Sequence, residues 1–283
     1  MMDTQHLIRG LNALSRAHGT DYFDNGHRGG AMLAAFFFCR ENPVEEKVPG
    51  VLTRMIDQHW PRTGLCEPYP DESSDPALLT RLVETMQANM GGLREAGHNV
   101  ILPALALKAF HHLPEAITAS RVAGICELVQ AFHKTDVPQA EDDSLPNLAD
   151  TAGAAEFLLA EFVRCTERFQ GRGQGWSGHL LTYGRALLDL CELGYVDLAE
   201  AALPGFRQYL RRIRLGPLDS DKPRPEHLRT DLSPLQTDYW TDRPGDWKLG
   251  HIIKYPYGLY GLLHLARNQE VQQACLAAAY RVL

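Results

Sequence analysis

The chain has 283 residues, a formal net charge of −7 and 45% hydrophobic residues, so it can bury one large core or two small ones. No basic run is longer than RRIR at 211–214, and this acidic balance argues against a nucleic-acid or anionic-membrane surface. We therefore expect a small-molecule partner. The sequence leaves the oligomeric state open.

The longest apolar run, AMLAAFFFC at 31–39, is too short to cross a bilayer, and the N-terminal MMDTQHLIRG has no apolar signal region. We expect a cytoplasmic protein. Its six cysteines are scattered singly and form no CxxC pair, which predicts reduced, buried thiols rather than a zinc knuckle or a redox motif.

Apolar residues recur with the period of a helix along most of the chain, and no stretch alternates as a strand requires. In chain order, the predicted helices lie at 6–19, 25–41, 48–60, 78–90, 96–113, 116–132, 152–169, 177–194, 196–213, 249–266 and 270–283. The polar connection at 215–248 is the longest loop.

Four of these helices open with the same Gly-His pair, at His27, His98, His179 and His251, which are 71, 81 and 72 residues apart. Such regular self-similarity predicts four structural repeats of helical hairpins. Few long repeats favour closure over an open solenoid. We therefore predict a single all-α domain over 1–283, folded as an α/α toroid, that is, a closed or nearly closed ring of hairpins with the Gly-His helices inside.

The four histidines would then begin inner helices that point the same way and would surround the mouth of a central cavity. Neutral imidazoles there would bind a metal ion or serve as a general base, because the positive end of a helix dipole disfavours imidazolium. The alternative is that Gly-His is only a good helix start. His27 fits the pattern least, since Arg28 and two glycines follow it.

Three further side chains on these helices are candidate catalytic groups. Tyr183 and Tyr255 stand four residues after His179 and His251, on the same face, and a core aromatic role explains each equally well. Lys254 lies on an otherwise apolar helix, where a lysine must be neutralised, paired or turned to a cavity.

The 215–248 segment exceeds the usual length of a structureless loop and is predicted to be a lid over the histidines. Its aromatic residues Tyr239, Trp240 and Trp247, with Trp176 before His179, would bind a flat substrate. In the alternative, the loop only packs its aromatic residues against outer helices.

Four stretches, DYFDNGHRGGAMLAAF, GHNVILPALALKAF, GHLLTYGRALLDL and GHIIKYPYGLYGLLHLA, resemble the questin oxidase-like family, and HIIK at 251–254 is the most specific piece. The resemblance implies an all-helical fold and NADPH-dependent oxygenation of the Baeyer–Villiger type that opens an anthraquinone ring. It transfers no catalytic residues. The chain itself carries no flavin or dinucleotide motif.

Three functions remain open on this basis. The first is an oxidoreductase that acts on an aromatic or polyketide-like molecule in a histidine-lined cavity. The second is a metal-dependent enzyme of another class, with a divalent ion bound by the four histidines. The third is a toroid that binds a small molecule without catalysis.

Overall fold

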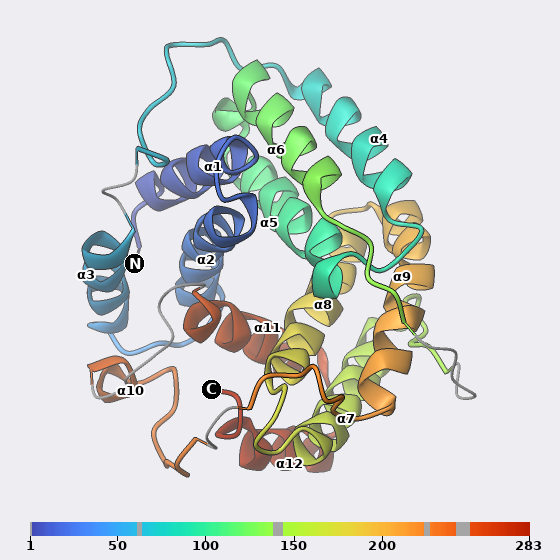
Figure 1. Cartoon of the computed structure of the whole chain (residues 1–283). Helices are drawn as coiled ribbons and strands as arrows, with labels where there is room; N and C mark the ends of the chain where they lie inside the picture. Colours follow the sequence, from blue (N-terminus) through green and yellow to red (C-terminus); the bar gives the residue numbers. More distant parts are fainter. Residues whose placement is uncertain (1, 61–63, 138–143, 224–226, 242–249) are drawn as a thin grey trace. The chain divides into compact units, whose positions relative to one another are not determined.

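The computed structural model describes residues 2–60, 64–137, 144–223, 227–241 and 250–283 (Figure 1). These residues form twelve α-helices and no strand, apart from two isolated bridges, so the all-α prediction is confirmed. None of these helices combines the length and the apolar character that spanning a bilayer requires. All six cysteines are free thiols, as predicted, and all are buried except Cys191, which is half-buried.

Every predicted helix is present. The helices are α1 (Gln5–Ala17), α2 (Tyr22–Glu41), α3 (Val48–His59), α4 (Leu79–Asn89), α5 (His98–His112), α6 (Ala119–Ala131), α7 (Thr151–Arg168), α8 (Gly175–Glu192), α9 (Val196–Arg214), α10 (Thr237–Thr241), α11 (His251–Leu265) and α12 (Gln269–Ala279). Only α10 falls in a segment where the sequence predicts a loop.

The chain divides into two compact units. The first unit consists of Met1–Asn89, Leu102–Phe132 and Leu232–Tyr257, and the second of Met90–Ile101, His133–Asp231 and Gly258–Leu283. Two of the five boundaries fall inside α5 and α11, so each of these helices contributes residues to both units. The single domain over 1–283 stays a prediction.

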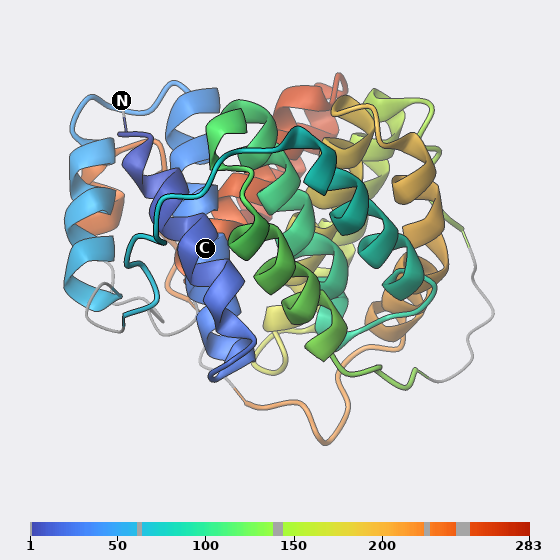
Figure 2. The same ribbon diagram turned by 90° about the horizontal axis from the view of Figure 1, so that it is seen from above.

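In the first unit, α1 packs against α2 and α6, and α4 lies beside α6 (Figures 1 and 2). Glycine allows the closest of these approaches. A Cβ atom on Gly124 of α6 would lie 1.9 Å from the backbone oxygen of Ser15 on α1. The aromatic side chains Phe36 and Phe38 of α2 are buried in the same unit.

In the second unit, α8 is the central contact helix, with α7 and α9 packed against it, while α12 lies along α7 (Figure 1). A Cβ atom on Gly184 of α8 would lie 2.8 Å from the Leu158 side chain of α7. A Cβ atom on Gly258 of α11 would likewise lie 2.8 Å from the backbone oxygen of Leu181. A small residue seven positions after His251 is therefore required by helix packing.

The prediction that Gly-His begins each helix is confirmed for two repeats and wrong for two. α5 begins at His98 and α11 at His251, whereas His27 and His179 lie in the second turn of α2 and α8. α2 starts earlier because the Asp21 side chain caps it by accepting a hydrogen bond from the Asp24 N–H. The Gly26 position faces Leu102 and Leu128 instead, so this glycine serves packing rather than capping.

Helix α10 is tied to the start of α3. The Leu235 carbonyl accepts a hydrogen bond from the Glu45 N–H (2.8 Å), and the Glu45 carboxylate accepts one from the Thr237 N–H (2.8 Å). A helix of five residues is too short to show a period in the sequence. These hydrogen bonds and side-chain burial hold it in place.

The Gly124 contact predicts a large effect from a small substitution. In Gly124→Ala, the new methyl group would overlap the α1 backbone, so the two helices must separate and the free energy of unfolding should fall by about 1–3 kcal/mol or more. Urea unfolding measures this. Gly91→Ala is the matched control, because its Cβ would meet nothing within 4 Å. Equal stability of the two variants would contradict this packing.

Candidate functional site

Two histidines face each other in the second unit. The Nε2 atoms of His98, at the start of α5, and His179, in α8, are 3.1 Å apart. Their ring centroids are 4.8 Å apart and the rings meet edge to face at 73°. Both side chains are buried, with residue exposures of 1% and 8%.

The other nitrogen of each ring contacts a backbone carbonyl oxygen. Nδ1 of His179 lies 2.7 Å from the Gly175 oxygen, and Nδ1 of His98 bonds the Glu95 oxygen. A carbonyl oxygen only accepts hydrogen bonds, so both Nδ1 atoms must carry the proton. In the neutral tautomer Nε2 then has a lone pair and no hydrogen, and two such lone pairs point toward one another.

The turn before His98 adopts an unusual backbone conformation. In η3 (Glu95–Gly97), Glu95, Ala96 and Gly97 have φ values of 41°, 59° and 96°. Positive φ is uncommon for residues with a side chain, and residues held in such strained conformations cluster at active sites, ligand clamps and switch regions. The Glu95 N–H donates to the Thr135 hydroxyl at 2.8 Å, which helps to hold the turn.

Tyr183 supports the same turn from α8. A Cβ on Gly97 would lie 2.3 Å from the Tyr183 ring, so the ring packs directly on the residue before His98. Tyr183 stands one turn after His179, and one helix therefore carries both a histidine of the pair and the aromatic residue that positions the other.

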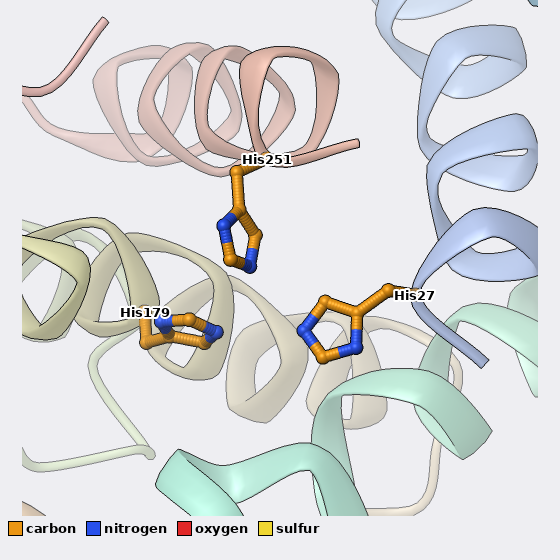
Figure 3. A group of neighbouring side chains, drawn as sticks. All are labelled: His27, His179 and His251. Atoms are coloured by element: carbon orange, nitrogen blue, oxygen red, sulfur yellow. The ribbon is translucent and has the colours of Figure 1, made fainter. Parts of the chain in front are cut away.

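The first unit holds the other two histidines as a second pair. The ring centroids of His27 (α2) and His251 (α11) are 5.0 Å apart, and the rings meet at 68°. Nδ1 of His27 donates to the Phe23 carbonyl at 2.7 Å, the arrangement found for His179. Figure 3 draws His27 and His251, with His179, and each of these three residues offers one ring nitrogen as a metal ligand.

Tyr255 confirms the predicted shared face in α11. Its ring stacks on that of His251, with centroids 4.8 Å apart and planes 11° apart. Tyr183 is fully buried and its hydroxyl donates to the Ala202 carbonyl at 3.4 Å. Burial raises the pKa of the Tyr183 phenol. These contacts give Tyr183 a packing role and keep its hydroxyl neutral.

Lys254 is buried in α11, with 2% exposure, and burial lowers the pKa of its amine well below the usual value. Of the three alternatives for Lys254, neutralised, paired or turned to a cavity, this burial favours the first. Whether Lys254, Tyr183, Tyr255 or the four histidines take part in catalysis stays a prediction, as does their convergence on one cavity.

The four aromatic residues predicted to bind substrate have different surroundings. The Trp176 indole N–H donates to Asp221 at 3.1 Å, and the Arg212 guanidinium lies 4.7 Å above its ring. Tyr239 and Trp240 are both buried in α10. Trp247 lies outside the described residues.

Trp240 packs within the first unit. Its ring meets Phe38 of α2 edge to face at 6.1 Å, and its N–H donates to the Pro234 carbonyl at 2.8 Å. These contacts are helix packing, as the alternative expects, but against α2, a Gly-His helix, rather than against an outer helix. The lid over the histidines stays a prediction.

Two parts of the site carry no sequence signal that would have identified them. Glu95 and Ala96 adopt positive φ without being glycine or asparagine, the residues that usually indicate it. The Asp221 carboxylate that accepts from Trp176 also pairs with Arg212 at 2.5 Å and lies in a polar stretch typical of any loop. Both depend on tertiary contacts.

No protein-family model, curated protein or solved structure matches this chain. The resemblance to the questin oxidase-like family accordingly rests on the quoted motifs alone. The chemistry of the site has to be argued from its own atoms.

The contacts of Trp240 predict that it contributes to stability. Trp240→Ala removes a buried indole and should lower the free energy of unfolding by about 3–5 kcal/mol. Chemical denaturation measures the change, with Trp240→Phe as a milder control. Unchanged stability combined with weaker ligand binding would instead assign Trp240 to a lid.

Proposed function

We propose that this protein binds a divalent first-row transition-metal ion through Nε2 of His98 and His179, with His27 and His251 as further ligands, and uses it to act on a small organic molecule. The proposal rests on the close approach of the two Nε2 atoms. In each ring, Nδ1 is at the same time hydrogen-bonded to a backbone carbonyl oxygen.

Two facing lone pairs repel each other unless a cation lies between or beside them. A metal ion accepts both lone pairs at once. Nitrogens bound at about 2.1 Å are about 3.0 Å apart at a right-angled centre and about 3.4 Å apart at a tetrahedral one. The 3.1 Å between the His98 and His179 nitrogens falls between these values. A proton shared by the two rings is the competing arrangement, so metal binding has to be measured.

The hydrogen bonds at Nδ1 support a ligand role. Metal-binding histidines usually donate their other ring N–H to a carboxylate or carbonyl, which fixes the tautomer and the orientation of the ring. His27, His98 and His179 all do so to backbone carbonyls. Burial also keeps competing water away from the ligand atoms.

The extension to His27 and His251 rests on the sequence repeat and on their own ring contact. This extension assumes the predicted closed ring of helical hairpins, in which each of the four repeats contributes an equivalent histidine. Four imidazoles without a carboxylate suit a borderline-soft ion such as Zn²⁺, Fe²⁺ or Co²⁺. Such an ion polarises a bound carbonyl or activates water when a coordination position stays open.

A second candidate is the oxidoreductase reaction that the family resemblance implies, oxygenation of an aromatic or polyketide-like molecule with NADPH. The stack of Tyr255 on His251 favours it, since it places an aromatic ring beside a histidine. Turnover of NADPH with a panel of quinones distinguishes this reaction from metal-dependent chemistry of another class. Binding of the panel without turnover would indicate a non-catalytic binding protein.

Metal binding is tested with Co²⁺ and Zn²⁺ on chelator-treated protein by calorimetry. We expect a stoichiometric site. Either His98→Ala or His179→Ala should weaken it by more than the roughly 10- to 100-fold that loss of an outer-shell partner costs, because each removes a direct ligand.

His6→Ala is the matched control. His6 is also buried and its Nδ1 contacts the Asp3 carbonyl at 3.2 Å, but it lies in α1 and has no histidine facing it among the described residues. Its substitution should leave the affinity unchanged. Failure of the unmodified protein to bind either ion, or an equal loss in His6→Ala, would contradict the proposal.

A further inference from the structure

We infer that Thr135 is a positioning residue for the histidine pair, because its hydroxyl group holds the turn that keeps the proton of His98 on Nδ1. The tautomer of His98 can be measured without metal, and only the effect on metal affinity rests on the proposed function. Both residues lie in the second unit, in the segments Met90–Ile101 and His133–Asp231.

The turn η3 is paired with the segment that contains Thr135. The Thr135 N–H donates to the Leu93 carbonyl at 2.9 Å, and an isolated antiparallel bridge joins Arg94 to Lys134. The Glu95 N–H donates to the Thr135 hydroxyl at 2.8 Å. Thr135 therefore contacts the chain on both sides of the bridge, at Leu93 through its backbone and at Glu95 through its side chain.

Two other hydrogen bonds fix the rest of this segment. The Leu93 N–H donates to Oε1 of Gln208 on α9 at 2.8 Å, and the Gly97 N–H donates to the Arg94 carbonyl at 2.8 Å, which closes the turn. Strained backbone of this kind persists only where its surroundings determine it. The threonine hydroxyl holds the peptide N–H of Glu95, the first of the two non-glycine residues with positive φ.

The conformation of Glu95 sets the direction of its carbonyl group, which accepts the hydrogen bond from Nδ1 of His98. The N–H and the carbonyl of a residue are joined through its Cα atom, so a change of φ turns one relative to the other. If Glu95 relaxed from its φ of 41° to an ordinary negative value, the carbonyl would turn away from its present direction. The hydroxyl of Thr135 opposes this relaxation by holding the N–H.

Without the Glu95 carbonyl, the His98 ring has another place for its proton. A proton on Nε2 would be donated to Nε2 of His179, 3.1 Å away, and the two lone pairs would no longer face each other. The bond at Nδ1 disfavours this arrangement. The turn that Thr135 holds therefore determines which tautomer of His98 is populated.

The test is the ¹⁵N chemical shift of the His98 ring nitrogens in histidine-labelled protein at about pH 8.5 with chelator, with signals assigned by their loss in His98→Gln and His179→Gln. An ordinary histidine, with a pKa near 6.5, is neutral there, so the shift reports the tautomer. We expect Nδ1–H at His98 in the unmodified protein. Thr135→Val keeps the side-chain shape without the acceptor and should raise the share of the Nε2–H tautomer roughly 2- to 10-fold, the change that one hydrogen bond can cause.

Thr135→Ser keeps the hydroxyl and should keep the tautomer of the unmodified protein. His179 is the internal control, because its Nδ1 bonds the Gly175 carbonyl of its own helix rather than η3. Thr135→Ala, which removes the hydroxyl without adding bulk, replaces the valine variant if valine prevents folding. An Nε2–H tautomer at His98 in the unmodified protein overturns the inference. So does a His98 shift that is unchanged in Thr135→Val, or a change that the His179 ring shares equally.

Metal titration of the same variants separates this inference from the metal site. If the protein binds Co²⁺, Thr135→Val should weaken binding by roughly 10- to 100-fold, the usual cost of losing an outer-shell partner, and Thr135→Ser should not. If the unmodified protein does not bind Co²⁺, the metal proposal fails while the tautomer measurement still decides the role of Thr135.

Discussion

The hydrogen bond from Nδ1 of a buried histidine to a backbone carbonyl is the interaction on which the candidate site depends. It occurs at His27, His98 and His179, twice to the carbonyl one helical turn earlier and once to the Glu95 carbonyl of η3. The bond fixes which nitrogen is protonated and therefore which one is left with a lone pair. Without it, the 3.1 Å approach of His98 to His179 would be an ordinary hydrogen bond between neutral rings.

The surrounding structure is arranged to keep that geometry. In η3, Glu95 and Ala96 have the unfavourable positive φ, and the Glu95 carbonyl faces the His98 ring. Such a conformation costs of order 1–3 kcal/mol for each residue. The Tyr183 ring packs on Gly97 and limits the turn from the other side. Such a conformation persists only where its neighbours determine it, which is consistent with a functional role for this turn.

The helical fold was predictable because the apolar period is strong in every long helix, and the repeat correctly located His98 and His251 at helix starts. The positions of His27 and His179 within their helices were not predictable. Asp21 and the residues around Gly175 begin those helices a turn earlier, and the glycine before His27 serves packing rather than capping. The pairing of the histidines and the positive φ of Glu95 arise from contacts between distant residues, which a local pattern does not encode.

The central claim is that Nε2 of His98 and Nε2 of His179 bind one metal ion together. Anomalous diffraction from crystals grown with Co²⁺ tests it most directly. The account predicts a single strong peak about 2.1 Å from both Nε2 atoms, with Nδ1 of each ring still bonded to its carbonyl. A cobalt peak elsewhere on the protein, with none at this pair, would contradict it.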